Sequence, residues 1–200
     1  MIKISWEKLE QEWRKQLLSY ANGDVLEVGV GRGDNFKYYP TGVHVTATDM
    51  SARAIEKAKV EARSRRVATT FHVSTMEGLE LKDKAFDTVV STFSLCAYDH
   101  PLQILKQFNQ WCKPDGTILL LEYGLSKCQL INWLQRKWDH HHYKRTGYHL
   151  NLDMFSLIAD SNLRVKKMEA KYAGIIYLVW ASLKPMTEKE LQNSFLKNTG

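Results

Sequence analysis

The chain alternates between short apolar runs and longer segments whose apolar residues recur at helical spacing. The apolar runs cover residues 25–28, 43–47, 70–73, 86–92 and 117–122. Helical patterns at 51–65 and 101–112 lie between some of these runs, so strands and helices alternate along the chain. This order predicts an α/β fold with a mainly parallel sheet and helices on both faces.

Both ends of this alternating region carry further elements. At the N-terminus, a helical spacing joins Trp6, Leu9, Trp13, Leu17 and Tyr20. Ser5 can serve as its N-cap, and Asn22-Gly23 ends it. Later in the chain we expect helices at 128–143 and 152–160, then strands at 163–171 and 175–183. Because only residues 172–174 separate the two strands, they should form an antiparallel hairpin.

Composition narrows the class of protein without identifying a function. The 200 residues are 44% hydrophobic and 25% charged, which is typical of a globular chain long enough for one core. A net charge of +6 suits an anionic partner such as a metabolite, a phospholipid surface or a nucleic acid. Three widely spaced cysteines fit no disulfide framework, so we expect a reducing, cytoplasmic location.

No segment predicts export or membrane insertion. The first residues are polar and charged where a signal peptide would be apolar. The most apolar stretch, 173–183, is about half the roughly 20 residues that a membrane-spanning helix needs. We interpret it as a buried strand.

A glycine-rich turn follows the first predicted strand. Gly29, Gly31 and Gly33 alternate with other residues between that strand and a helical segment. Glycines at such a turn let the backbone approach a ligand where a Cβ would collide. Asp49 ends the second predicted strand, where a carboxylate can accept both hydroxyls of a ribose. The two features should meet at the carboxyl edge of the sheet.

A dinucleotide-binding dehydrogenase is the main alternative for this pattern. Its G-x-G-x-x-G turn requires a glycine where this chain has Asp34. Glu27, two residues before the first glycine, also disfavours a pyrophosphate and suits a cationic ligand group.

The E-x-G-x-G-x-G turn followed by the acidic end of strand two resembles class I S-adenosylmethionine-dependent methyltransferases. Residues 86–90 resemble the family's fourth strand, and 112–116 its turn before strand five, with Asp115 replacing a glycine. Residues 35–40, 94–96 and 147–150 are most similar to the quinone, phospholipid and small-thiol branch. The resemblance implies a Rossmann-like seven-stranded, mainly parallel sheet with an antiparallel last strand.

The same resemblance assigns a cofactor site. The residues that it implies for S-adenosylmethionine are Glu27, Gly29, Gly31, Gly33, Asp49, Met50, Thr75, Met76, Glu77, Thr92 and Phe93. Glu27 would lie near the amino group of the methionine part, Asp49 would hold the ribose, and Met50 would pack on adenine. Thr75 occupies the position where relatives carry an acidic residue, so we expect Glu77 or the backbone at Met76 to contact the adenine instead.

Histidines supply candidates for proton transfer from an acceptor. Adjacent helical side chains diverge by about 100°, so His140, His141 and His142 cannot share one metal ion, and we predict no metal site. His140, His142 or His149, with Trp138 and Tyr143, instead lines an acceptor pocket or an exposed helical face. His100 is a further candidate base with Asp99, although Asp99 can equally cap the helix that Pro101 opens.

The sequence therefore predicts one methyltransferase domain over residues 1–200. Its parts are an N-terminal helix (1–22), a cofactor-binding half (23–124), an acceptor side (125–185) and a polar tail (186–200). The predicted reaction moves a methyl group from S-adenosylmethionine to a small thiol, quinol, phenol or amine, leaving S-adenosylhomocysteine. The alternatives are an NAD(P)-dependent oxidoreductase and a cofactor-binding module without turnover.

The predicted partners follow from the same reading. We expect a small-molecule acceptor, no nucleic acid, and a monomer or weak homodimer. Peripheral contact with anionic lipid stays open, with the basic stretch from Lys57 to Arg66 as its candidate surface.

Overall fold

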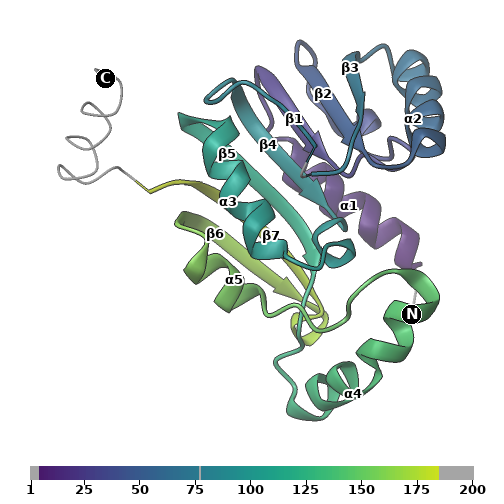
Figure 1. Ribbon diagram of the computed structural model, residues 1–200, viewed down its shortest axis with the longest axis vertical. Coiled ribbons are helices and arrows are strands. Elements are labelled where there is room, and N and C mark those ends of the chain that lie inside the picture. Colours follow the sequence, from purple (N-terminus) through teal and green to yellow (C-terminus); the bar gives the residue numbers. More distant parts are fainter. Residues whose placement is uncertain (1–4, 77, 185–200) are drawn as a thin grey trace.

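The computed structural model describes residues 5–76 and 78–184, and it has a single seven-stranded sheet (Figure 1). The strand order is β3-β2-β1-β4-β5-β7-β6. The strands are β1 (Asp24–Val28), β2 (His44–Asp49), β3 (Ala68–Val73), β4 (Phe86–Thr92), β5 (Cys112–Tyr123), β6 (Leu163–Lys171) and β7 (Ile176–Leu183).

The sheet is mainly parallel with a reversed last strand, as the sequence predicts. β1 to β5 pair in parallel, whereas β7 pairs antiparallel with both β5 and β6. The strand order reverses at β1, whose neighbours are β2 on one side and β4 on the other. In open α/β sheets ligands bind beyond the carboxyl ends of the strands at such a point.

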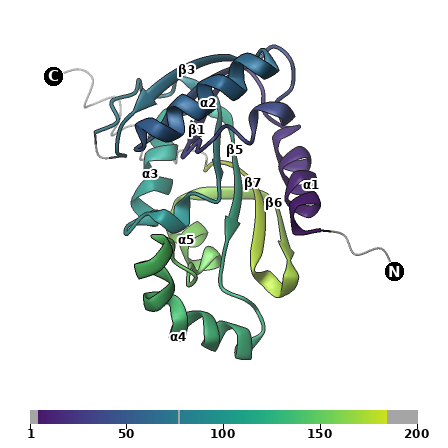
Figure 2. The same ribbon diagram turned by 90° about the vertical axis from the view of Figure 1, so that its right-hand side faces the viewer.

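Helices cover both faces of the sheet. They are α1 (Trp6–Leu18), α2 (Ala52–Arg65), α3 (Pro101–Trp111), α4 (Gln129–Thr146) and α5 (Met154–Asp160), with short 3-10 helices η1 (Phe36–Tyr38), η2 (Leu95–Ala97) and η3 (Tyr172–Gly174). One core joins α1 and α2 to the sheet, and the other joins α3 and α5 to it. Figure 2 shows α1 and α3 on opposite sides of the strands.

The local reasons for these elements are visible at their ends. The Ser5 side chain accepts from the Lys8 N–H and so caps α1 as predicted. Helix α4 ends at Thr146, three residues beyond the predicted Tyr143. Its C-cap, Gly147, has the left-handed φ of +74° that favours glycine at this position. Strand β5 begins at Cys112 and includes the predicted turn at 112–116, instead of beginning at the predicted residue 117, and it has a register shift against β4.

Helix α1 ends at Leu18, before the predicted end at Asn22-Gly23, so Tyr20 lies in the turn that follows it. Trp13 and Tyr20 both take structural positions. Trp13 is buried in the core beneath α1, where its ring packs against Trp6 and Tyr172. Tyr20 packs edge-on against Trp180. The predicted tail at 186–200 and Glu77 lie outside the described residues.

Candidate functional site

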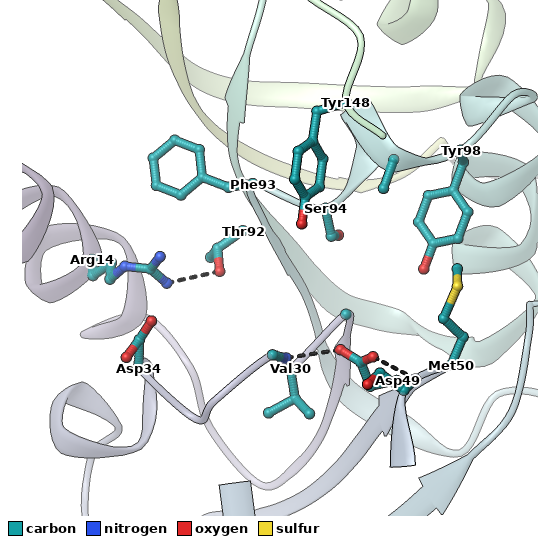
Figure 3. Close-up of a pocket in the computed structure, with 14 residues that line it drawn as sticks. Arg14, Val30, Asp34, Asp49, Met50, Thr92, Phe93, Ser94, Tyr98 and Tyr148 are labelled. Carbon is teal, nitrogen blue, oxygen red and sulfur yellow. Dashed lines mark hydrogen bonds between the residues drawn. The ribbon is translucent and has the colours of Figure 1, made fainter. Parts of the chain in front are cut away.

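A pocket of about 400 Å³ opens at the carboxyl ends of β1, β2 and β4 (Figure 3). Its volume falls within the range of small-molecule sites. The lining residues are Arg14, Gly29, Val30, Gly31, Asp34, Asp49, Met50, Ser51, Thr92, Phe93, Ser94, Ala97, Tyr98 and Tyr148. In Figure 3, Arg14 and Asp34 lie at one end of the pocket, and Met50 and Tyr98 lie at the other.

Two glycines of the turn after β1 are needed for different reasons. Gly29 has a φ of +69°, and a Cβ there would lie 2.5 Å from the Ser94 Cβ, so this glycine permits close packing between two loops. Gly31 has a φ of +56°, and nothing lies within 4 Å of an added Cβ. The backbone at Gly31 therefore faces the open pocket and can approach a ligand.

Asp49 organises the turn from the end of β2. The Gly31 N–H donates to Asp49 Oδ2 at 2.9 Å, and the Ser51 N–H donates to Oδ1 at 2.9 Å. Each carboxylate oxygen has further lone pairs. Asp49 can therefore hold the loop and still accept hydroxyl protons from a ligand in the pocket.

Arg14 brings a nearly buried cation to the pocket from α1. Its Nη1 donates to Asn35 Oδ1 at 2.6 Å and to Thr92 Oγ1 at 2.9 Å, while Nε and Nη2 donate to Glu10. The guanidinium also lies 5.2 Å from the centroid of the Phe93 ring. These contacts fix the cation at one end of the pocket, where it can bind a carboxylate.

Glu27 lies behind this end of the pocket and does not line it. Its carboxylate accepts from Asn35 Nδ2 at 2.8 Å and from the Tyr39 hydroxyl at 2.9 Å, and the side chain is buried. Burial raises the pKa of Glu27 to about 7. Asn35 stands between Glu27 and Arg14, so Glu27 positions the residues that face the ligand.

A second buried carboxylate, Glu122 at the end of β5, holds the turn after β4. It accepts from the Ser91 hydroxyl at 2.6 Å and from the backbone N–H groups of Ser94 and Leu95. Burial raises its pKa to about 7. The turn includes Phe93, whose φ of +52° is costly for a residue with a side chain. Glu122 thus stabilises a strained segment of the pocket wall.

A histidine with two carboxylate neighbours lies beside the pocket. His149 Nδ1 is 2.9 Å from Oδ2 of the buried Asp139, and its Nε2 is 3.9 Å from Asp99. The Tyr143 ring stacks on the imidazole at 4.2 Å, and the Tyr143 hydroxyl donates to Asp99. Asp139 therefore orients the imidazole, and Nε2 lies toward the exposed Asp99.

The structure places the other predicted site residues as follows. Met50, Thr92 and Phe93 line the pocket with Gly29, Gly31 and Asp49. Gly33 is outside it and packs against the Phe36 ring. Thr75 is exposed and Met76 is buried in the core beneath α3, so neither lines the pocket.

The remaining histidine candidates lie apart from the pocket. His100 is exposed at the N-cap of α3, without a side-chain capping bond, and Asp99 bonds to Tyr143 instead of capping that helix. His140 is exposed on α4 and does not line the pocket. His142 lines a separate groove with the exposed Trp138, so neither of these two lines the acceptor pocket. Among the described residues, no three potential ligands are grouped for a metal ion.

Three functional groups escaped the sequence analysis. Arg14 resembles any polar residue of an amphipathic helix, Glu122 looks like a solvent-facing strand end, and Asp139 begins the histidine run. Of the three, only Glu122 offered a signal in the sequence: it ends a predicted buried strand, and a carboxylate at that position lies at the ligand-binding edge of the sheet. Cys96 is a buried core residue, and burial raises the pKa of its thiol to about 12.

Comparisons with known proteins agree with this geometry. A family profile described as "Methyltransferase domain" matches residues 26–120, which include the glycine turn, Asp49 and β4. Residues 26–120 thus form a methyltransferase domain, and the similar proteins are named as quinone-biosynthesis, thiol and phosphatidylethanolamine methyltransferases. That family uses S-adenosylmethionine as its methyl donor.

Individual relatives show how far the similarity extends. The chain is 29% identical over 205 aligned positions to "Methyltransferase OMS1, mitochondrial" of Saccharomyces cerevisiae, covering 92% of this chain and 43% of the yeast protein. It is 30% identical to "Thiol S-methyltransferase TMT1B" of Rattus norvegicus, covering 68% of this chain and 62% of the rat protein. The chain thus spans roughly half of the curated relatives it matches.

A solved structure confirms the fold. An S-adenosylmethionine-dependent methyltransferase from Aquifex aeolicus superposes with a TM-score of 0.65 at 15% identity, covering 90% of this chain and 94% of that one. Within residues 5–76 and 78–184, no helix is both long and apolar enough to cross a membrane.

Proposed function

We propose that this chain transfers the methyl group of S-adenosylmethionine to a small acceptor. The observation that carries the proposal is the arrangement of opposite charges along one pocket. Arg14 lies at one end, Asp49 lies by the glycine turn, and Met50 lies at the far end (Figure 3). This order matches a carboxylate, a ribose and an adenine in sequence.

The residues present fit that ligand. Arg14 would bind the carboxylate of the methionine part, and Asp34 beside it would bind the ammonium group. Asp49 would accept from the ribose hydroxyls while still holding Gly31 and Ser51. The exposed side chain of Met50 would cover one face of the adenine. These residues account for the groups of S-adenosylmethionine without requiring the pyrophosphate of a dinucleotide.

The contributions of the protein to the reaction are positioning and exclusion of water. Bound S-adenosylmethionine supplies an electrophilic methyl group on a sulfonium. The aromatic rings of Phe93, Tyr98 and Tyr148 line the pocket and favour a cation near their faces. The Glu122 contacts hold Phe93 and Ser94 in place, so the wall of the pocket is ready before the acceptor binds.

His149 is the proposed proton acceptor, ahead of His100 and His142. It follows Tyr148, which lines the pocket, and the backbone N–H of His149 donates to the Cys96 carbonyl next to Ala97. Asp139 fixes Nδ1, so Nε2 is the nitrogen free to take a proton from a thiol or phenol. The acceptor class is supported by the thiol methyltransferase name of one relative.

Location and association state are part of the proposal. Three free cysteines support a reducing compartment, as in the cytoplasm. The name of the yeast relative points to mitochondria for that protein. Cell fractionation with an antibody against the chain decides between the two, and sedimentation measures whether the chain is a monomer or a weak homodimer.

The experiment is a product assay with the purified chain. Mass spectrometry follows S-adenosylhomocysteine after S-adenosylmethionine is mixed with an alkyl thiol, a quinol, a phenol or an amine. Product that needs one acceptor supports the enzyme. Binding without product for every acceptor class supports a cofactor-binding module instead.

A further inference from the structure

Helix α4 packs on the rest of the protein through polar side chains. Asn132 donates to the Ser126 carbonyl, Gln135 donates to the carbonyls of Gly124 and Leu150, and Tyr143 donates to Asp99. Asp139 is the only buried residue of the helix. These four residues are spaced by three or four positions and therefore share one side of the helix.

The opposite side of α4 is apolar and exposed. Its apolar residues are Leu130, Trp133, Leu134 and Trp138, which are 67%, 55%, 41% and 58% exposed. No described residue of α4 belongs to either hydrophobic core. Both ribbon views place α4 at the end of the molecule away from α2 (Figures 1 and 2). Helix α4 therefore turns its polar side toward the protein and its apolar side outward, which is the reverse of the usual orientation of an amphipathic helix.

Basic residues accompany this apolar stripe. Lys137, Lys144 and Arg145 are exposed on the same side, and the Lys137 ammonium lies 4.8 Å from the Trp133 ring centroid. The only acidic residue in the sequence of α4 is Asp139, which points toward His149 and Leu150. The outer face of α4 is thus cationic and aromatic without a neighbouring negative charge from its own helix.

We propose that this surface, defined as the α4 outer face (Leu130, Trp133, Leu134, Lys137, Trp138, Lys144 and Arg145), docks on an anionic phospholipid bilayer. Tryptophan prefers the boundary between headgroups and acyl chains. Lysine and arginine keep their charges at the anionic headgroups while their stems cover apolar surface. Charge complementarity therefore selects a bilayer over a neutral apolar partner.

The basic stretch of α2 is a weaker candidate for the same partner. Lys59 pairs with Glu56 and Arg65 pairs with Glu61, so part of its charge is neutralised on its own helix. Val60 is exposed there without a neighbouring tryptophan on α2. This helix therefore supplies a matched control surface.

Docking would also orient the pocket. α4 ends at Thr146 with Gly147 as its C-cap, and the next residue, Tyr148, lines the pocket. A docked α4 would hold the acceptor side of the pocket close to the bilayer, where lipophilic acceptors partition. The binding surface itself does not depend on the proposed reaction, so it can be tested without turnover.

The test is co-sedimentation of the full chain with vesicles of phosphatidylcholine alone and of phosphatidylcholine mixed with phosphatidylserine. We expect binding to the mixed vesicles, weakened by salt, because each basic residue near an anionic surface strengthens binding roughly fivefold. The double variant Lys137→Glu with Lys144→Glu should lose at least tenfold in partitioning. Lys57→Glu with Arg63→Glu carries the same charge change on α2 and should lose much less.

Tryptophan variants separate insertion from charge attraction. Trp133→Ser with Trp138→Ser should abolish most binding, whereas Val60→Ser on α2 should retain it. Brominated lipid should quench the wild-type fluorescence, and Trp133→Phe with Trp138→Phe should lose that quenching while Trp6→Phe keeps it. Unchanged circular dichroism and S-adenosylhomocysteine binding show that each variant folds.

Several outcomes overturn the proposal. Equal loss in the α2 and α4 charge variants would assign binding to net charge. A concentration-dependent dimer that the tryptophan variants abolish, without vesicle binding, would make a second copy the occupant. Binding to single-stranded oligonucleotide but not to vesicles would assign the surface to nucleic acid.

Discussion

Arg14 and Thr92 are 78 residues apart in the sequence, and a hydrogen bond of 2.9 Å joins Arg14 Nη1 to Thr92 Oγ1. The bond ties the N-terminal helix to the end of β4 directly at the pocket. Because Arg14 also donates to Asn35, one guanidinium connects α1, the segment after the glycine turn and β4. This side chain assembles the end of the pocket where we place the carboxylate of the ligand.

Replacing Arg14 by alanine should therefore weaken binding of S-adenosylhomocysteine. Loss of a charged hydrogen-bond partner costs about 1.5–3 kcal/mol, or roughly ten- to a hundredfold in affinity. Isothermal titration calorimetry measures the effect, and Arg14→Lys should recover part of it. Lys15→Ala on the exposed side of α1 is the matched control. Equal affinities for the Arg14 and Lys15 variants would remove Arg14 from the site.

Two glycines of the same turn should respond differently to alanine. Gly29→Ala places a Cβ against Ser94, so it should lower the melting temperature strongly. Gly31→Ala projects into open space, so it should cost only the roughly 1–2 kcal/mol of a left-handed alanine while blocking the ligand. Thermal unfolding and calorimetry of both variants check the contrast. A Gly31→Ala variant with undiminished affinity would show that the ligand does not approach this backbone.

The buried carboxyls predict a pH dependence of stability. Glu27 and Glu122 titrate near 7 when folded but near the ordinary pKa of 4.5 when unfolded. Between these values the folded chain retains protons that the unfolded chain has released. Stability therefore falls as pH rises from 4.5 to 7, by roughly 3 kcal/mol for each group, and levels off above that range.

Urea unfolding at several pH values measures this fall. Glu122→Gln should show a smaller decrease than the unmodified chain, because the titrating group is gone. Glu169→Gln is the control: its lysine partners hold the pKa of Glu169 at about 2, so its titration lies below the window. A Glu122→Gln profile as steep as that of the unmodified chain would contradict the assignment.

The proposed role of His149 predicts a dependence on the acceptor. His149→Ala should lower kcat by about 10² or more for alkyl thiols that arrive protonated. Thiols already ionised at the assay pH should lose far less, and added imidazole should restore part of the rate. His140→Ala, exposed on α4, is the control. Equal loss for both kinds of thiol would mean that His149 only supports the fold.

Asp139 gives a separate check on that role. Asp139→Asn keeps a polar group beside His149 but removes the charge that stabilises the protonated ring. It should lower kcat for alkyl thiols with little change in KM for S-adenosylmethionine. A change confined to KM would indicate a structural role for the pair.

Local patterns predicted the parts of the fold that depend on local physics. Alternating strands and helices, the Ser5 cap and the short 172–174 connection all follow from residues close in sequence. The burial of Arg14 does not, because it depends on how α1 crosses the end of β4. The helical spacing of α4 likewise reveals two faces, but only the contacts of Gln135 show that the polar face is the inner one.

The measurement that tests the central claim most directly is calorimetric titration of the purified chain with S-adenosylhomocysteine and, separately, with NADH. The account predicts one saturable site for the nucleoside thioether, weakened by Arg14→Ala and Gly31→Ala, and no heat with NADH. Tight NADH binding that the same two variants weaken, without heat from S-adenosylhomocysteine, would contradict it.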